Sequence, residues 1–385
     1  MARRVFLHIG LPKTGTTYLQ TIMWHNRAQM RQDGILLPGD ERRDHLWSSL
    51  VVREDPKVYR RNPKARSSWD RIVGQIAEWA DDAVISHEYF AGASEEQARD
   101  AIEALAPAEV HIVVTGRDPL GLFTASWQEL VKLRGTTPIE KYSRTSSSNP
   151  LRIWNWRALD TGEVLERWAV HVPNERVHVL PLTPESPREL LWQRFAGVIG
   201  AEADNYDLTS SHPNESMGVV ETEMLRRVNA HLSDFSKAYD VGVWIRSYLG
   251  EGQLVTRKGE KFWPDADQVE ICRQRGRDMV SLIREREYDV VGDVDDLLVP
   301  DDLPERRHPG SVTDAEVAGA AVETVASMLR DVRRLTYDLR AAQRKLARAR
   351  RKCPVAVPEK ARSRMRRIVL DSPVLTRVYR KMRRV

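Results

Sequence analysis

Short apolar runs alternate with helical patterns along most of the chain. The runs typical of buried strands cover residues 3–10, 82–86, 110–115 and 176–182. Between them, apolar side chains recur at helical spacing over residues 95–105, 120–133 and 162–170. Strands that alternate with helices in this way build a parallel sheet with helices on both faces. The pattern therefore predicts an α/β fold, a three-layer sandwich around a central parallel sheet.

The chain divides into a body and a C-terminal extension. Two further helices are predicted at 221–235 and 265–287, and the body closes over residues 288–298, before Pro300. The polar run 142–150 is typical of a surface loop. We predict four parts: an α/β domain at 1–300, a linker at 301–312, a helical segment at 313–350 and a basic amphipathic tail at 351–385.

The helical segment carries a heptad pattern. Four aliphatic residues lie seven apart, namely Val325, Val332, Leu339 and Leu346. Val322 and Leu329 lie three residues before the first two of them, whereas Thr336 and Gln343 occupy the matching later positions. One apolar seam along a helix is the pattern of a coiled coil. Self-association through residues 322–346 is therefore one hypothesis for the extension.

Charge is distributed unevenly along the 385 residues. The net charge is +5 and the pI about 9.2, but residues 330–385 contribute +16, which leaves −11 for the rest. An acidic body is not typical of nucleic-acid binding, so no nucleic-acid partner is predicted. Two other hypotheses for the basic tail are a solvated segment and a peripheral contact with an anionic membrane face through residues 365–385.

Composition narrows the expected setting. Hydrophobic residues make up 41% of the chain, enough for a sizeable core. Two cysteines, Cys272 and Cys353, cannot build a disulfide framework or a cysteine-rich metal site. The chain has no apolar run of membrane-spanning length, and its N-terminus lacks the signal-peptide pattern. We expect a cytoplasmic protein, or one held peripherally on the inner membrane face.

The loop after the first predicted strand is suited to an anion. Residues 10–17 read G-L-P-K-T-G-T-T, close to the nucleotide-binding loop G-x-x-x-x-G-K-[ST]. Its glycines allow backbone N–H groups to approach a phosphate at the start of a helix. However, Thr16 stands where that motif requires lysine, and the lysine is at position 13. This displacement weakens the case for an ATPase.

The same loop resembles the 5′-phosphosulfate loop of sulfotransferases that use 3′-phosphoadenosine 5′-phosphosulfate (PAPS). The similarity is carried by P-K-T-G-T-T after a strand, within residues 6–20. It implies that Lys13 contacts the bridging oxygen of the donor and stabilises charge on the departing phosphate. It also implies that Thr14, Gly15, Thr16 and Thr17 hold the 5′-phosphate.

Two more landmarks of that family have counterparts here. An arginine after a later strand and a serine in the next helix hold the 3′-phosphate, which assigns Arg117 and Ser126. The usual spacing of eight residues lands on Ala125, so Thr124 is a second candidate for the hydroxyl. The base that deprotonates the acceptor is Glu88 or His87, with a slight preference for Glu88.

The resemblance implies transfer of a sulfuryl group from PAPS to a hydroxyl or amine. The expected acceptor is a small molecule, a sugar or a lipid, and no metal is expected. Two alternatives are a nucleotide kinase or NTPase on the same P-loop-like fold and a non-catalytic scaffold with a degenerate nucleotide site. Asn214 and Ser216 are predicted to cap a helix or contact a ligand, and Arg257 and Lys258 match a short family loop only by coincidence.

Overall fold

The computed structural model describes residues 1–352 except 61–62, 144–145, 150, 184–185 and 211–215. The basic tail predicted at 351–385 lies outside this range from residue 353 onward, and Asn214 also lies outside it. The chain divides into two compact units, Met1–Ala321 and Val322–Val385. Each unit is described by itself below.

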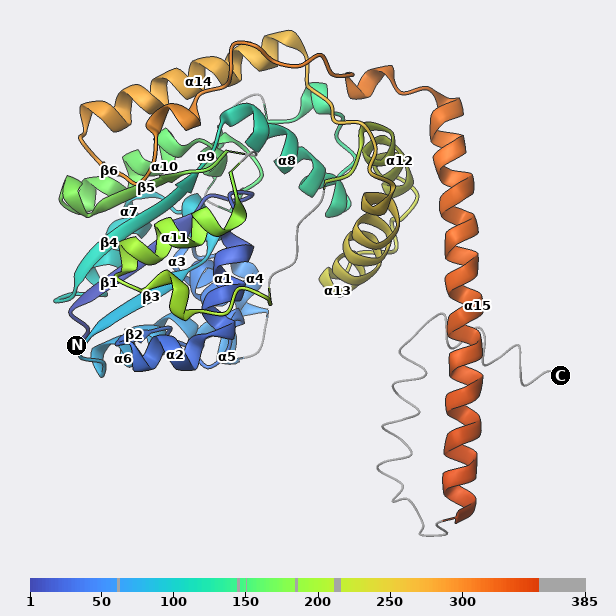
Figure 1. Cartoon of the computed structure of the whole chain (residues 1–385), viewed down its shortest axis with the longest axis horizontal. Helices are drawn as coiled ribbons and strands as arrows, with labels where there is room; N and C mark the ends of the chain where they lie inside the picture. Colours follow the sequence, from blue (N-terminus) through green and yellow to red (C-terminus); the bar gives the residue numbers. More distant parts are fainter. Residues whose placement is uncertain (61–62, 144–145, 150, 184–185, 211–215, 353–385) are drawn as a thin grey trace. The chain divides into compact units, whose positions relative to one another are not determined.

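The first unit is built on a six-stranded, all-parallel sheet, which confirms the predicted fold class (Figure 1). The strand order is β2-β3-β1-β4-β5-β6. The strands span Arg4–Gly10 (β1), Ile35–Leu36 (β2), Asp82–Ser86 (β3), Glu109–Gly116 (β4), Val177–Pro181 (β5) and Asp289–Val290 (β6). The four predicted strands are the central four of the sheet.

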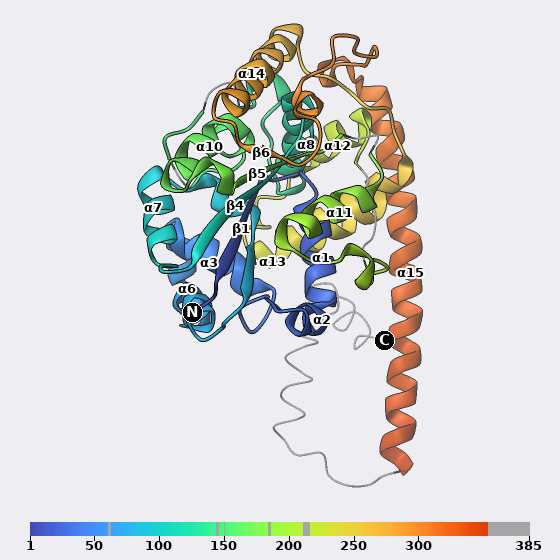
Figure 2. The ribbon, with the colours of Figure 1, turned by 60° about the vertical axis from the view of Figure 1, so that its left-hand side comes forward.

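Side chains of the strands alternate between two cores because successive residues point to opposite faces. Val5, Leu7 and Ile9 of β1 pack in one core, whereas Phe6 packs in the other. The first core is covered by α6 (Ser68–Ala77), α7 (Glu95–Glu103), α10 (Thr161–Trp168) and α14 (Ala266–Glu285). The second is covered by α1 (Thr16–His25), α2 (Arg27–Gln32) and α11 (Arg188–Ile199). Figure 2 shows α7 and α10 on one side of the sheet and α1 and α11 on the other.

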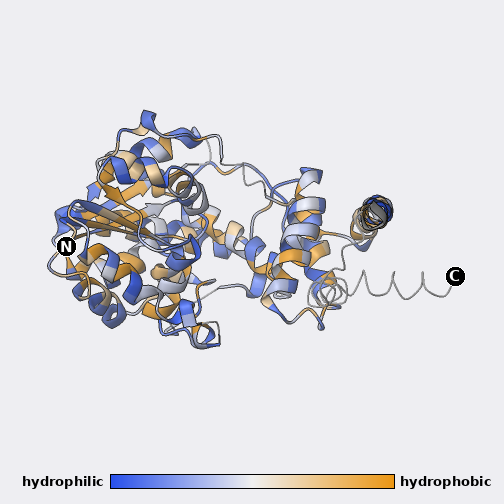
Figure 3. Ribbon diagram, turned by 90° about the horizontal axis from the view of Figure 1, so that it is seen from below, coloured by the Kyte–Doolittle hydropathy of each residue, from blue (hydrophilic) through white to orange (hydrophobic). Residues whose placement is uncertain are grey.

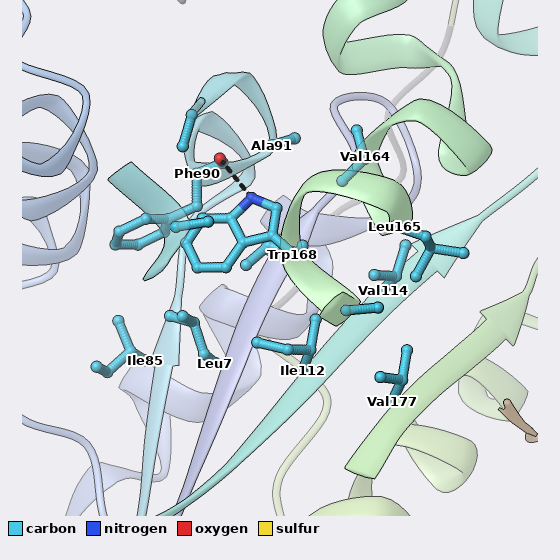
Figure 4. Packing of buried hydrophobic residues seen from close by; sticks show 14 of the residues in the cluster. Leu7, Ile85, Phe90, Ala91, Ile112, Val114, Val164, Leu165, Trp168 and Val177 are labelled. Atoms are coloured by element: carbon cyan, nitrogen blue, oxygen red, sulfur yellow. Dashed lines mark hydrogen bonds between the residues drawn. The ribbon is translucent and has the colours of Figure 1, made fainter. Parts of the chain in front are cut away.

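The core under α10 illustrates this packing (Figure 4). Trp168 of α10 is fully buried among aliphatic residues of the strands, and its indole N–H donates to the carbonyl oxygen of Phe90 at 3.2 Å. A buried indole needs such a partner, because an unpaired N–H in the core is costly. Figure 3 shows the apolar residues gathered along the strands and the adjoining helix faces.

A further hydrophobic cluster lies around α8 (Pro119–Lys132). It includes residues of α9 (Trp156–Leu159), α12 (Val219–Asn229) and η6, a π-helix at Val241–Leu254. Val312 and Ala320 also belong to it, so residues after 300 pack onto the body. The remaining α-helices described in this unit are α3 (Arg43–Val52), α4 (Pro56–Tyr59), α5 (Pro63–Arg66) and α13 (Ala238–Asp240).

The helix α15 (Asp314–Lys352) begins in the first unit and supplies the described part of the second. Several of its apolar side chains are exposed: Val322, Val325, Leu329, Val332, Leu335, Tyr337 and Leu346. Among the described residues, no helix is both long and apolar enough to cross a membrane.

Candidate functional site

The carboxyl ends of β1, β3 and β4 open onto a cavity of about 1200 Å³. Its lining includes Lys13 after β1, Glu88 after β3 and Arg117 after β4. In the sheet, β1 lies between β3 and β4, so the connection from β3 to β4 passes over β1. The loops that leave β1 and β4 therefore run to opposite sides of the sheet at this edge. Ligands of open parallel sheets bind at such a switch point. Three residues predicted from separate parts of the sequence therefore meet in one site.

Three residues of the loop from Gly10 to Thr17 have a positive φ, but only two of them are glycine. Gly10 has φ 93° and Gly15, the N-cap of α1, has φ 82°. A Cβ on Gly10 would lie 2.7 Å from the Cα of Glu88, so glycine is required there. Lys13 also has a positive φ, 69°, although it is not glycine. Non-glycine residues held in this region are strained, a condition that clusters at functional sites.

The hydroxyl groups of the loop point in different directions. Thr14 is fully buried; its hydroxyl donates to the carbonyl oxygen of Leu11 at 2.6 Å and shares a hydrogen bond with Thr115 at 2.6 Å. The Thr16 hydroxyl donates a hydrogen bond to the Glu88 carboxylate, and Thr17 is exposed. Gly15, Thr16 and Thr17 line the cavity. Thr14 thus ties the loop to β4, and its hydroxyl is already engaged.

His8 in β1 anchors the same edge of the sheet. Its ring is fully buried, with Nδ1 at 2.8 Å from Ser86 Oγ and Nε2 at 3.3 Å from Thr115 Oγ1. Burial lowers the pKa of His8 to about 4, so the ring is neutral at pH 7. Through Thr115, this histidine is connected to Thr14 of the loop.

Glu88 faces the cavity, and His87 does not line it. The Nδ1 of His87 accepts from the backbone N–H of Tyr89 at 3.1 Å, which caps the short helix η1 (Glu88–Gly92). Burial lowers the pKa of His87. Burial alone would raise the pKa of Glu88, but His87 and hydrogen bonds from its own backbone, Gln20 and Thr16 lower it. Glu88 is therefore an ionised carboxylate at this edge of the sheet.

Arg117 lines the cavity beside the start of α8. Its buried Nε has no hydrogen-bond partner among the described residues and lies 3.6 Å from Asp118 Oδ2. Asp118 caps α8 by accepting the backbone N–H of Gly121 at 2.6 Å. A guanidinium group beside a helix N-terminus is a suitable partner for a phosphate.

Ser126 lies on the other side of α8 from the cavity lining. It is fully buried, donates to the carbonyl oxygen of Phe123 at 3.0 Å and accepts from the Tyr142 hydroxyl at 2.8 Å. Thr124 and Ala125 line the cavity in its place. One residue along a helix rotates a side chain by about 100°, so a shift of one position moves the hydroxyl from the site to the core.

The sequence did not single out Glu129, Lys132 and Arg246, all of which line the cavity. Glu129 Oε2 lies 3.1 Å from Lys13 Nζ, and its Oε1 lies 3.0 Å from Arg246 Nε. Burial would raise the pKa of Glu129, but Lys13, Arg246 and Lys132 lower it. The only signal was the position of Glu129 three residues after Ser126, the predicted 3′-phosphate serine, because Arg246 is distant in sequence.

Ser216, predicted to cap a helix or contact a ligand, lines the cavity, and so does Trp154. Arg257 is not among the lining residues and forms an ion pair with Glu221 at 2.9 Å. Trp47, Trp69 and Trp156 are buried. Among the described residues, no group of three or more His, Cys, Asp or Glu side chains is arranged to hold a metal ion.

Comparisons with known proteins give one similar solved structure. No family model matches the chain, and no curated protein matches it. A sulfotransferase from Alicyclobacillus acidocaldarius aligns with 16% identity and a TM-score of 0.37, over 55% of this chain and 87% of its own.

Proposed function

We propose that the protein transfers the sulfuryl group of PAPS to a hydroxyl or amine of a small-molecule, sugar or lipid acceptor. The observation that carries the proposal is one cavity lined by the lysine of the loop after β1, the arginine after β4 and the carboxylate after β3. A bisphosphorylated donor needs two separate anion sites, and the N-termini of α1 and α8 supply them beside Lys13 and Arg117.

The reaction is an in-line displacement at sulfur. Glu88 accepts the proton of the acceptor, whose oxygen or nitrogen forms a bond to sulfur as the bond from sulfur to the 5′-phosphate oxygen breaks. Lys13 stabilises the negative charge that develops on that oxygen. Backbone N–H groups of residues 15–17 hold the 5′-phosphate, and Arg117 with Thr124 holds the 3′-phosphate of the product, 3′-phosphoadenosine 5′-phosphate (PAP).

Of the two candidate bases, the cavity favours Glu88. Its carboxylate lines the cavity and stays ionised, whereas Nδ1 of His87 is occupied by the backbone of Tyr89. A nucleotide kinase is disfavoured because Thr16 replaces the lysine that grips β- and γ-phosphates.

Calorimetric titration with PAP, beside ATP, tests the donor site. We expect PAP to bind the wild-type protein at least tenfold more tightly than ATP, and Arg117→Ala to lose at least tenfold in affinity. Arg99→Ala, an exposed arginine on α7, is the matched control and should bind as the wild type does. If the protein binds Mg²⁺-ATP but not PAP, the result would favour the kinase. If it binds neither nucleotide, the result would favour the non-catalytic scaffold.

A further inference from the structure

Glu129 joins two cations that come from distant parts of the chain. It lies on α8, its side chain is 6% exposed, and each of its oxygens has its own partner: Lys13 for Oε2 and Arg246 for Oε1. A buried carboxylate is costly unless opposite charges surround it. The position of Lys13 and the position of Arg246 are therefore both fixed by Glu129.

We propose that Glu129 is a positioning residue that aims the Lys13 ammonium at the donor's bridging oxygen. This inference rests on the proposed function. The Lys13 side chain is 29% exposed and borders the cavity, so its ammonium is accessible while one of its hydrogen bonds goes to Glu129. A long, flexible lysine gains direction from such a fixed partner, and a misplacement of about 1 Å can cost about 100-fold in rate.

Arg246, the second partner of Glu129, lies in the π-helix η6. It also lies 3.5 Å from Glu251, five residues later, and both residues line the cavity. In an α-helix, residues five apart point to different faces. The i→i+5 bonding of a π-helix aligns them, and such segments are frequent at functional sites. Glu129 thus links the phosphate loop to the wall that η6 forms.

A double-mutant cycle between Lys13 and Glu129 tests the inference. Lys13→Met, Glu129→Gln and the double variant are compared in two assays: PAP affinity by calorimetry, and cleavage of PAPS with water as the acceptor. We expect Glu129→Gln to lower the kcat of cleavage at least 30-fold with less than a threefold change in KM, and to change the Kd for PAP at least threefold. Neither effect should appear when Lys13→Met is already present.

The control is Glu223→Gln on α12, which removes a carboxylate that is only 5% exposed and pairs with Arg226 and Arg227, but that does not line the cavity. It should leave PAPS cleavage within threefold of the wild type. Equal effects of Glu129→Gln in both backgrounds would overturn the positioning role while the donor site stands. Failure of the wild-type protein to bind PAP would overturn the proposed function and this inference together.

Four exposed apolar side chains of α15, namely Val325, Val332, Leu335 and Leu346, support a second, independent inference. With Val325, Val332, Leu339 and Leu346 at position a of a heptad, Met328, Leu335 and Ala342 fall at position d. The described basic residues from 330 to 348 almost all fall at the outward positions b, c and f: Arg330, Arg333, Arg334, Arg340, Arg344 and Arg348. Lys345 is the exception, at g.

From this placement we infer that α15 pairs in parallel with α15 of a second copy of the chain. Asp331 and Asp338 flank the seam at g, opposite the uncharged Thr336 and Gln343 at e, so a parallel partner meets no like charges there. Arg334 turns toward Asp331, 3.2 Å away on its own helix. A membrane-seeking face would carry bulky aromatic residues without acidic neighbours, which this seam does not resemble.

The molar mass in solution tests the pairing. Light scattering behind size exclusion should give twice 44.1 kDa for the full chain. Val332→Glu with Leu339→Glu should return the monomer, whereas the outward control Arg333→Glu should not. A monomeric wild type would overturn the inference. Flotation of that monomer with phosphatidylserine vesicles, lost in the double variant, would assign the same face to a membrane.

Discussion

Lys13 is the residue on which local strain and proposed chemistry meet. Its φ of 69° lies in the left-handed region, which costs a non-glycine residue about 1–2 kcal/mol. We expect Lys13→Gly and Lys13→Ala to lose PAPS cleavage alike, because both remove the ammonium. The free energy of unfolding of Lys13→Gly, measured in urea, should nevertheless be about 1 kcal/mol higher than that of Lys13→Ala, because only glycine relieves the backbone strain. Equal stabilities would mean that the loop relaxes when the side chain is removed.

His8 and His45 give the fold a defined response to acid. Burial lowers the pKa of each to about 4, against about 6.5 in an unfolded chain. As the pH falls, the unfolded chain binds these protons first. The free energy of unfolding should therefore be highest above pH 6.5 and fall toward pH 4, by up to about 1.4 kcal/mol per pH unit for each histidine.

Urea titrations at several pH values measure this response. His8→Asn should flatten it, because the variant removes one buried, neutral imidazole. An unchanged slope in His8→Asn would contradict the buried, neutral histidine.

The proposed base is tested by a pair of neighbouring variants. Glu88→Gln should lower PAPS cleavage by about 100-fold or more, since general-base catalysis contributes on that order. His87→Asn should retain cleavage within about tenfold, although it removes a cap of η1. Because the pKa of Glu88 is lowered, the wild-type rate should hold as the pH falls to about 5. The reverse ranking of the two variants would assign the base to His87.

The site residues found from the sequence are those marked by local motifs. Lys13, Arg117 and Glu88 each follow a strand, and the parallel sheet brings strand ends together whatever lies between them. Glu129 and Arg246 were missed because their pairing depends on how η6 folds back onto α8, which no local pattern encodes. Ser126 is a serine, as the family resemblance requires, but its side chain lies in the core, where it accepts a hydrogen bond from Tyr142.

At the scale of elements, the strongest patterns were the most predictable. The four long strands and α8, α14 and α15 follow runs of period two or 3.6. β2 has only two residues, too few for a pattern. In η6, the buried residues Ile245, Leu249 and Leu254 are spaced by four and then five positions, so a search for α-helical periodicity does not find the π-helix.

Variants of two helix caps distinguish an effect on stability from an effect on PAP binding. Asp118 caps α8 at the cavity, and Ser94 caps α7 in a capping box with Gln97. Replacement by alanine should cost about 1 kcal/mol of unfolding free energy in each case. Only Asp118→Ala should also change the affinity for PAP, because Asp118 neighbours Arg117. A similar change in Ser94→Ala would point to general loosening of the fold.

At the scale of the molecule, the body extends further than the predicted boundary at 300. Val312 and Ala320 are buried in the cluster around α8, and Arg307 pairs with Glu316 at 2.7 Å. A chain truncated after Ala321 should keep the PAP affinity and the unfolding midpoint of the full chain. Truncation after Gly310 removes those apolar contacts and should cost about 2–5 kcal/mol. Equal stability of the two truncations would return the boundary to the predicted linker.

The cytoplasmic setting, the membrane contact of the tail and the acceptor class stay predictions from the sequence. The acceptor is difficult to derive because the cavity lining mixes seven basic and seven acidic side chains with aromatic ones, Trp154 and Trp263 among them. No single charge or shape dominates that wall, so an acceptor screen is the direct approach.

The uneven charge of the two parts has a practical consequence at the bench. The pI of 9.2 suggests a protein for cation exchange, yet that value describes neither part of the chain. At pH 7, the full chain should bind a cation exchanger through its C-terminal extension alone. Once protease trims the extension, the acidic body should flow through that column and bind an anion exchanger. A preparation that splits between the two resins therefore reports clipping, before any gel is run.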